Sequence, residues 1–412
     1  MTVRETNSIF EQILPGGSRG QVQSDVKFGN NQMQWMSEVH HQDPRTKAYL
    51  GSPSILRLPD GALLAMHDFF GRAVKNRNGE CGLMAVYRSE DDGRSWRQIT
   101  FIDGAFWGNL FMDGGAVYHV GSAQEYGDLV IRRSTDGGFT WTEPKDERSG
   151  LLRRAGAGRR PPNYESSGNV ALLHGRVVMP FVEMQGEWGG WLPERYGMFI
   201  MSAPSGCDLL DAGNYRETNQ VRFDRTKLAD PAMAHEHSGW LEGTPVETPE
   251  GASACFARIH LAVPDYAVRF DISEDFSELS FDYADGLIPF VGGHSKFEIR
   301  CDEKTGVYFT LTNPYTGPTE HKILFARNEL ALAVSRDLRR WRKAATILRA
   351  DPDMSAAEAR RMVGFQYVDW RFDGDDIIFL CRTAYDGAAN FHDSNRITYH
   401  VIKDFRRYIK DC

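Results

Sequence analysis

The stretch Ser89-Glu90-Asp91-Asp92-Gly93-Arg94-Ser95-Trp96 decides how this chain folds, and Ser134-Thr135-Asp136-Gly137-Gly138-Phe139-Thr140-Trp141 repeats its pattern. Both follow the spacing Ser-x-Asp-x-Gly-x-x-Trp. The Asp side chain can accept hydrogen bonds from N–H groups of its own turn, and the Gly supplies a positive φ. The Trp then re-enters a strand and packs across the base of the turn. Each copy follows an apolar, strand-like segment, so the pair predicts a repeated β unit.

Two degenerate copies extend the pattern along the chain. Ser335-Arg336-Asp337-Leu338-Arg339-Arg340-Trp341 lacks the Gly and is one residue shorter, and Ser273-Glu274-Asp275-Phe276-Ser277 lacks both the Gly and the Trp. Two strand-like segments joined by Pro59-Asp60-Gly61 form a predicted hairpin before the first copy. Together with the strands around that copy, this hairpin predicts a four-stranded antiparallel unit.

These repeats resemble the Asp-box, or BNR, repeats of sialidase-like β-propellers. The resemblance runs from about Leu50 to Arg406 and implies an all-β propeller of four-stranded antiparallel blades, six or seven in number. We expect one domain over residues 1–412. We also expect residues 1–45 to close the propeller by completing a blade, which hides a sheet edge. Six blade starts can be counted, and a second resemblance, described below, favours seven blades. The one helix we expect runs from Ser355 to Met362, with Ser355 as its cap and Glu358 following.

Composition excludes several classes of partner. The net charge is −8 and no run of Lys or Arg stands out, so we expect no nucleic acid to bind. Six cysteines lie far apart without a Cys-x-x-Cys pair, which favours isolated reduced thiols. The polar segment from Met1 to Gly20 contains no apolar core of a signal peptide, and no run is long enough to span a membrane. We therefore expect a cytoplasmic protein; its oligomeric state stays open.

The register of the hairpins predicts where a site would form. Centring the first hairpin on Asp60-Gly61 places His67 opposite Ser54, near the open end of the central tunnel. His67 with Asp68 is the predicted catalytic pair, since a histidine there can act as general acid or base. The alternative is a histidine that caps a strand. The same arithmetic places Arg382 beside Gln366 at the same rim.

Polar residues from other blades are expected at this rim as well. The predicted substrate-binding residues are Asp68, Arg160, Glu165, His294, Lys296, Gln366 and Arg382. Arginine can hold a carboxylate through two parallel hydrogen bonds. For the loops that carry these residues, the alternative is a solvated basic loop or a plain bend into a strand.

Two further groups of residues suggest ligand contacts. His392, Asp393 and Asn395 present an imidazole and two hard oxygens, which could bind a divalent cation such as Ca²⁺ in the central channel. The alternative is a hydrogen-bonded loop. Trp188, Trp191 and Tyr196 cluster in a Gly-rich insertion and would suit stacking on sugar rings, or simply loop packing. We expect an oligosaccharide substrate and no organic cofactor.

The sialidase resemblance implies an arginine triad that binds the substrate carboxylate, a tyrosine nucleophile supported by a glutamate, and an aspartate acid/base. The first arginine of that family stands in an Arg-Ile-Pro motif at the start of the first inner strand. The corresponding segment here is Gly51-Ser52-Pro53-Ser54-Ile55, which contains no arginine. That departure argues against an exo-α-sialidase, which stays an alternative.

Other motifs resemble seven-bladed propellers that cleave L-rhamnose-α-1,4-D-glucuronate linkages as lyases or as His-dependent glycosidases. The matching segments are Gly51 to Ser54, His67 to Gly71, and Asn390 to His400. The resemblance implies His67 as base or acid, Arg160 and Arg382 as carboxylate clamps, and Tyr164 or Tyr367 as a second proton-transfer group. Elimination and hydrolysis both stay open, as does a non-catalytic sugar-binding or interaction propeller.

Overall fold

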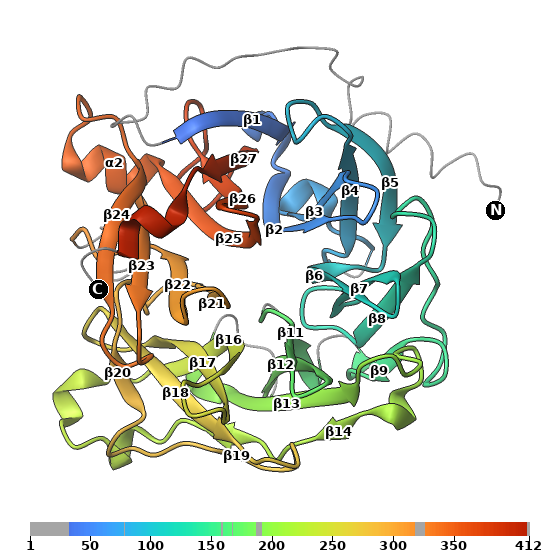
Figure 1. The fold of residues 1–412 in the computed structure, drawn as a ribbon, viewed down its shortest axis with the longest axis vertical. Helices are drawn as coiled ribbons and strands as arrows, with labels where there is room; N and C mark the ends of the chain where they lie inside the picture. Colours follow the sequence, from blue (N-terminus) through green and yellow to red (C-terminus); the bar gives the residue numbers. More distant parts are fainter. Residues whose placement is uncertain are drawn as a thin grey trace.

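The computed structural model describes residues 33–77, 79–157, 160–166, 168–186, 192–317 and 326–409. Their strands form six sheets arranged around one axis (Figure 1). The protein is therefore an all-β propeller of antiparallel blades, as the repeats predict. The preference for seven blades is wrong. Strand β1 (Met33–His41), from the N-terminal segment, joins the last blade by pairing with β27 (Arg396–Ile402) and forms no separate blade.

The blades follow one another along the chain, each built from the axis outward. The first blade contains β2 (Tyr49–Arg57), β3 (Leu63–Phe70), β4 (Leu83–Ser89) and β5 (Arg97–Asp103). The second contains β6 (Phe106–Asp113), β7 (Ala116–Ser122), β8 (Leu129–Ser134) and β9 (Leu151–Arg153). The third contains β10 (Asn163–Glu165) and β11 (Ala171–Leu173), both paired with β12 (Arg176–Met184), then β13 (Tyr196–Pro204), β14 (Arg216–Glu217) and β15 (Val221–Arg222).

The remaining three blades complete the ring. The fourth contains β16 (Gly239–Glu247), β17 (Ser253–His260), β18 (Tyr266–Ile272), β19 (Leu279–Ser280) and β20 (Leu287–Pro289). The fifth contains β21 (Ile299–Asp302), β22 (Val307–Thr312), β23 (Glu329–Ser335) and β24 (Arg342–Arg349), and the sixth β25 (Gly364–Asp373), β26 (Asp376–Ala384), β27 and β1. Helix α2 (Ala356–Met362) confirms the predicted helix, and the Ser355 hydroxyl accepts the Glu358 N–H at 3.2 Å.

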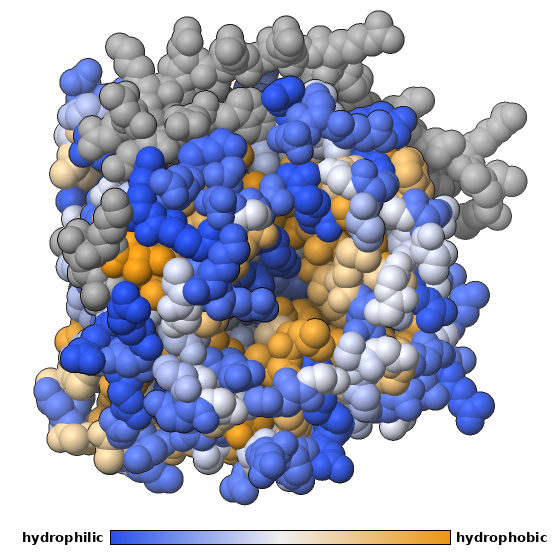
Figure 2. All heavy atoms as spheres, in the orientation of Figure 1, coloured by the Kyte–Doolittle hydropathy of each residue, from blue (hydrophilic) through white to orange (hydrophobic). Residues whose placement is uncertain are grey.

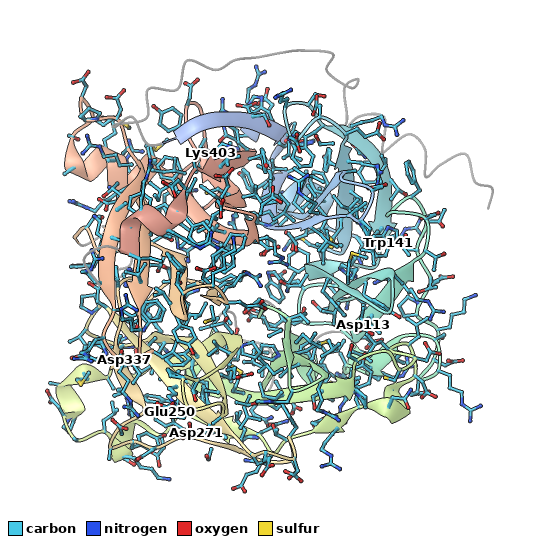
Figure 3. All side chains as sticks on the ribbon, viewed as in Figure 1. Asp113, Trp141, Glu250, Asp271, Asp337 and Lys403 are labelled. Carbon is cyan, nitrogen blue, oxygen red and sulfur yellow. The ribbon has the colours of Figure 1, made fainter. Side chains whose placement is uncertain are left out.

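The four Ser-x-Asp stretches all form turns between the third and fourth strands of a blade, and Figure 3 marks Trp141 and Asp337 in two of them. In each turn the Asp carboxylate accepts backbone N–H groups that follow it, as Asp136 does from Thr140 at 3.0 Å. The residue after the Asp has a positive φ in all four: Asp92, Gly137, Phe276 and Leu338. Phe276 and Leu338 hold this position with side chains buried in the core, and that burial offsets the backbone strain.

Apolar side chains fill the spaces between neighbouring blades, with the large rings of Trp240 and Trp370 fully buried. The axis itself stays polar. The space-filling view shows a hollow at the centre of the ring with hydrophilic residues at its floor (Figure 2). The five cysteines within the described ranges are all free. Among the same residues, no helix is both long and apolar enough to cross a membrane.

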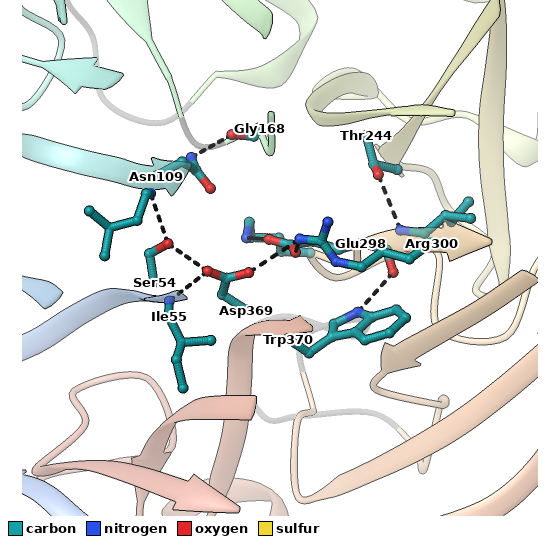
Figure 4. Close-up of polar contacts among 12 residues, drawn as sticks. Ser54, Ile55, Asn109, Gly168, Thr244, Glu298, Arg300, Asp369 and Trp370 are labelled. Atoms are coloured by element: carbon teal, nitrogen blue, oxygen red, sulfur yellow. Dashed lines mark hydrogen bonds and ion pairs between the residues drawn. The ribbon is translucent and has the colours of Figure 1, made fainter. Parts of the chain in front are cut away.

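Hydrogen bonds near the axis join every blade to the next, and Figure 4 shows several of them. The Asp369 carboxylate accepts the Ile55 N–H at 2.8 Å, and the Ser54 hydroxyl accepts the Leu110 N–H at 3.0 Å. The other four junctions are Asn109 to the Gly168 carbonyl, the Asn169 N–H to Gly243, the Ile299 N–H to Thr244 and the Trp370 indole to the Glu298 carbonyl. This closed ring of polar contacts holds the innermost strands in register around the channel.

Replacing Thr244 by valine tests the contribution of one such junction. Thr244 is fully buried, and its hydroxyl is the acceptor for the Ile299 N–H at 3.1 Å. We expect the free energy of unfolding to fall by about 1–3 kcal/mol, since the substitution leaves a buried donor unsatisfied. The matched control is Thr310→Val, because the equally buried Thr310 hydroxyl has no hydrogen-bond partner. Urea unfolding of both variants checks this, and equal losses would contradict it.

Candidate functional site

Four of the innermost strands carry a β-bulge near the same end. The register shifts between Leu50 and Pro53 in β2, Phe106 and Asn109 in β6, Leu241 and Gly243 in β16, and Gln366 and Asp369 in β25. A bulge bends its strand and re-aims the extra side chain, and bulges are frequent beside active sites. One mouth of the channel is therefore built from side chains that a regular strand would direct elsewhere.

Three bulged residues other than glycine have left-handed backbones. Trp107, Glu242 and Tyr367 have φ values of 48°, 58° and 52°. Such a conformation costs on the order of 1–3 kcal/mol for a residue with a side chain, and it persists where the surrounding structure enforces it. Three blades thus present one strained aromatic or acidic side chain each at the same position. Tryptophan, glutamate and tyrosine all disfavour this conformation by themselves.

Tyr367 lies between two buried arginines. The guanidinium carbons of Arg327 and Arg382 are 5.0 Å and 4.9 Å from the centre of its ring. A third buried arginine, Arg258, donates a hydrogen bond to the Glu242 carboxylate at 3.0 Å. All three guanidinium groups interact electrostatically with both Tyr367 and Glu242. This group of five residues is called the arginine cluster below: Glu242 and Arg258 belong to the fourth blade, Arg327 lies just before β23 of the fifth, and Tyr367 and Arg382 belong to the sixth.

Burial shapes the charges of the arginine cluster. It lowers the pKa of Arg327 to about 10 and lowers the pKa of Arg382 from its ordinary value. Burial also disfavours charge on Arg258, but the neighbouring Glu242 carboxylate raises its pKa overall. All three arginines therefore stay protonated at neutral pH. The described residues give Arg382 no carboxylate partner within ion-pair distance, so its charge is available to an anionic ligand.

Hydrogen bonds to groups of the sixth blade hold the side chains of Arg327 and Arg382 in place. Arg327 donates to the side-chain oxygen of Gln366, whose amide group donates in turn to the Phe391 carbonyl and the Ser394 hydroxyl. Arg382 donates to the His392 carbonyl at 2.6 Å, and its guanidinium lies 4.5 Å from the ring centre of Phe70. Gln366 pairs with Arg382 across β25 and β26, as the hairpin arithmetic predicts.

A second set of groups faces the cluster from blades two and three. Glu165 is buried and hydrogen-bonds Tyr196, whose hydroxyl lies 3.1 Å from that of Tyr126. Glu165 also interacts electrostatically with Arg258, which joins this set to the arginine cluster. The ring of Trp107 meets Tyr126 edge-on, with centres 5.1 Å apart. The mouth therefore combines cations, carboxylates and aromatic rings.

The predicted catalytic histidine lies away from this mouth. His67 is fully buried, its ring stacks on Tyr87, and its nitrogens contact the Asp68 carbonyl at 3.0 Å and the Tyr87 hydroxyl at 3.3 Å. Burial lowers its pKa to about 3. It pairs with Pro53 rather than with Ser54, so the predicted register is wrong by one residue.

Asp68 also has a structural environment. It is fully buried, and its two oxygens accept the N–H groups of Ser52 and Trp107, each at 2.8 Å. Burial raises its pKa to about 6, although these two bonds oppose the shift. Its carboxylate thus joins the bulges of β2 and β6.

The other predicted residues are distributed as follows. Tyr164 packs in the apolar core of blades two and three, and burial raises its pKa to about 12. Arg160 is exposed. His294 is buried with Nδ1 3.6 Å from Asp265, and its carbonyl accepts a hydrogen bond from Arg258 at 2.9 Å. Lys296 is buried in an ion pair with Glu298 at 2.9 Å.

The three predicted metal ligands have separate partners. His392 Nδ1 contacts Asp393 at 3.0 Å, whereas the Asn395 side chain bonds the backbone of Tyr385 and Asp386. Within the part of the chain that the structure describes, no group of three or more His, Cys, Asp or Glu side chains is placed to hold a metal ion. The divalent cation therefore stays a prediction. Trp188 and Trp191 lie outside the described residues.

Sequence reasoning missed five residues of the mouth: Trp107, Tyr126, Glu242, Arg258 and Arg327. They come from three different blades, and none lies in a recurring motif. One signal was present in the sequence. Glu242 and Arg258 flank the turn of one hairpin at nearly symmetric distances, as Gln366 and Arg382 do, so the same arithmetic would have paired them.

Comparisons with known proteins identify the fold. No family model and no curated protein matches the chain. Among solved structures, a Penicillium chrysogenum alpha-L-arabinanase complexed with arabinobiose is 14% identical, with TM-score 0.52 over 89% of this chain and 97% of that one. A Dyadobacter fermentans protein of unknown function is 12% identical, with TM-score 0.58 over 90% and 98%. The Trypanosoma rangeli sialidase in complex with the inhibitor DANA is 14% identical, with TM-score 0.55 over 91% and 57%. The chain thus shares the propeller fold of sialidases and arabinanases.

Proposed function

We propose that this protein is a glycoside hydrolase that cleaves a sugar bearing a carboxylate, with Tyr367 as nucleophile. The observation that carries the proposal is the position of Tyr367. It is held in a left-handed conformation between Arg327 and Arg382, within electrostatic reach of the Arg258–Glu242 pair. A tyrosine hydroxyl suits a substrate that carries a carboxylate near the reacting carbon, because an anionic nucleophile would be repelled by that charge.

Three converging guanidinium groups suit recognition of a carboxylate. Arginine binds this group through parallel hydrogen bonds that a neutral sugar cannot satisfy. The sialidase resemblance implies an arginine in the first blade, where this chain has Gly51. A Cβ atom on Gly51 would lie 1.5 Å from the Asp68 carboxylate, so no side chain fits there. Arg382 instead extends from the sixth blade over Phe70 of the first. It takes the role of the absent arginine in this proposal.

The remaining groups supply the proton transfers. Glu242 accepts the Tyr367 hydroxyl proton as the phenol oxygen forms a bond to the anomeric carbon. Glu165 donates a proton to the glycosidic oxygen as its bond to that carbon breaks. Water then attacks the same carbon, gives its proton to Glu165 and releases Tyr367, which regains its proton from Glu242. The sugar complexes among proteins of this fold support an oligosaccharide substrate.

A panel of three substrates tests the proposal. We would measure release from a fluorogenic α-sialoside, from a rhamnosyl-glucuronate disaccharide and from arabinobiose, with ultraviolet absorbance as the readout for an unsaturated uronate. Hydrolysis of either acidic substrate without rising absorbance supports the proposal. Rising absorbance would replace it with a uronate lyase in which Tyr367 acts as base. Cleavage of arabinobiose alone would refute the requirement for a carboxylate.

Arg382→Met is expected to raise KM for the acidic substrate by about 30-fold, because one charge-assisted contact to the carboxylate is lost. The matched control is Arg349→Met in β24, since Arg349 is exposed on the outermost strand of a blade. Steady-state kinetics of both variants provide the measurement. An unchanged KM in Arg382→Met would remove this residue from the carboxylate site.

A further inference from the structure

We propose that Trp107 is the platform on which the sugar of the leaving group stacks, and that Asp68 is the positioning residue that holds it in place. This inference rests on the proposed hydrolase function and adds a second sugar-binding position to it. The platform is defined here as the ring of Trp107, which the buried ring of Tyr126 supports edge-on.

Trp107 holds the same position in the bulge of β6 that Tyr367 holds in the bulge of β25, and this position lies at the mouth. In β6, two residues, Trp107 and Gly108, stand opposite one, just as Tyr367 and Val368 do in β25. Trp107 and Tyr367 are the first residues of these bulges, and both have left-handed backbones. Propeller blades repeat around one axis, so equivalent positions present their side chains to the same region. Trp107 is also only partly buried, whereas the neighbouring Phe106 is buried.

The position of blade two shows which part of the substrate would reach it. The arginine cluster belongs to blades four to six, and β6 lies across the axis from β21 of the fifth blade (Figure 1). A carboxylate held by the arginines leaves the rest of the substrate to extend towards blade two. The apolar face of a sugar ring packs well on an indole, because it replaces water on both surfaces. The occupant is therefore the leaving-group sugar of an oligosaccharide.

Asp68 accounts for the strained backbone of Trp107. One carboxylate oxygen accepts the Trp107 N–H and the other the Ser52 N–H, so a single fully buried side chain joins two bulges. The Trp107 carbonyl is held from the other side by the Ser166 hydroxyl at 3.2 Å. Asparagine at position 68 could accept only one of the two N–H groups and would direct its own NH₂ group at the other. The backbone at Trp107 would then relax.

Two leaving groups on the same acidic sugar separate this role from catalysis. We would compare the disaccharide that the wild type cleaves with the corresponding glycosyl fluoride, whose leaving group is too small to reach the platform. For Trp107→Ala, kcat/KM for the disaccharide should fall about 30-fold, while the value for the fluoride should stay within about threefold. Asp68→Asn should show the same selective loss, and the double variant should lose no more than Trp107→Ala alone.

Three outcomes would decide the inference. Equal losses on both substrates in the two variants would overturn it, because a merely structural role lowers both values alike. Additive losses in the double variant would overturn the positioning role of Asp68. If the wild type cleaves only a neutral sugar, the proposed function fails, and the same pair of leaving groups on that sugar then tests the platform independently. Trp107→Phe, which keeps an aromatic ring, should restore most of the disaccharide activity.

Discussion

Tyr367→Phe is expected to lower kcat for the acidic substrate at least about 1,000-fold while KM changes little. The substitution removes only the hydroxyl, so the ring keeps its contacts with Arg327 and Arg382. Loss of a nucleophile acts on the chemical step rather than on binding. The matched control is Tyr385→Phe, because Tyr385 belongs to the same blade and its ring stacks on Phe365 rather than on an arginine of the cluster. Steady-state kinetics with purified variants check this expectation.

A trapping experiment identifies the nucleophile directly. A fluorinated substrate analogue that stops after the first step should add its mass to one peptide, and fragmentation should place it on Tyr367. Glu242→Gln should slow formation of this adduct. Modification of Glu165 or Glu242 instead, with activity retained in Tyr367→Phe, would mean that a pair of carboxylates performs the reaction. The proposed tyrosine mechanism would then be abandoned, whereas the position of the site would stand.

A register difference of one residue in one hairpin explains why His67, the predicted catalytic residue, faces the other side of its strand. Side chains alternate between the two faces of a strand, so a slip of one residue reverses their direction. His67 was predicted opposite Ser54, whose hydroxyl points into the ring of contacts at the axis. In the structure His67 stands opposite Pro53 and points into the packing between blades. The sixth blade, whose turn Asp373-Gly374 is tight, was predicted in the correct register.

The sequence predicts the turns well, but it predicts only part of the residues at the mouth of the channel. An Asp turn depends on a few neighbouring residues, so Ser335 to Trp341 could be identified even without its glycine. The left-handed backbones of Trp107, Glu242 and Tyr367 depend on contacts from other blades, such as the bond from Trp107 to Asp68. Local preference disfavours a positive φ for all three residue types. Tyr367 and Arg382 were predicted from resemblance or register, but their meeting with Arg327 required the folded ring.

Acidification is expected to unfold this protein well above the pH at which ordinary carboxylates are protonated. Burial lowers the pKa values of His67, His294 and His400 to about 3 and that of His40 to about 4, and it lowers that of His119 well below 6.5. The unfolded chain binds protons at these histidines below pH 6.5, whereas the folded chain does not. Their contribution to stability is therefore present above pH 6.5 and is lost as the pH falls.

Two buried carboxyl groups act in the opposite direction. Burial raises the pKa of Asp68 to about 6 and that of Asp369 to about 8, so near pH 5 the folded chain holds protons there that the unfolded chain has released. On unfolding near pH 5, these five histidines take up about five protons and the two carboxyl groups release about two. The net uptake is therefore about three protons. The free energy of unfolding should then fall by about 4 kcal/mol per pH unit between pH 6 and pH 4.5. Urea unfolding at intervals across this range measures the slope.

His119→Leu isolates one of these protons. Both ring nitrogens of His119 lack a hydrogen-bond partner and the side chain is fully buried, so leucine removes a titrating group without removing a bond. The slope should decrease by about 1.4 kcal/mol per pH unit, and the variant should be more stable than the wild type at pH 5. The matched control is the same replacement at the exposed His174. A slope that is flat in the wild type, or equal in both variants, would show that these histidines already carry protons in the folded ring.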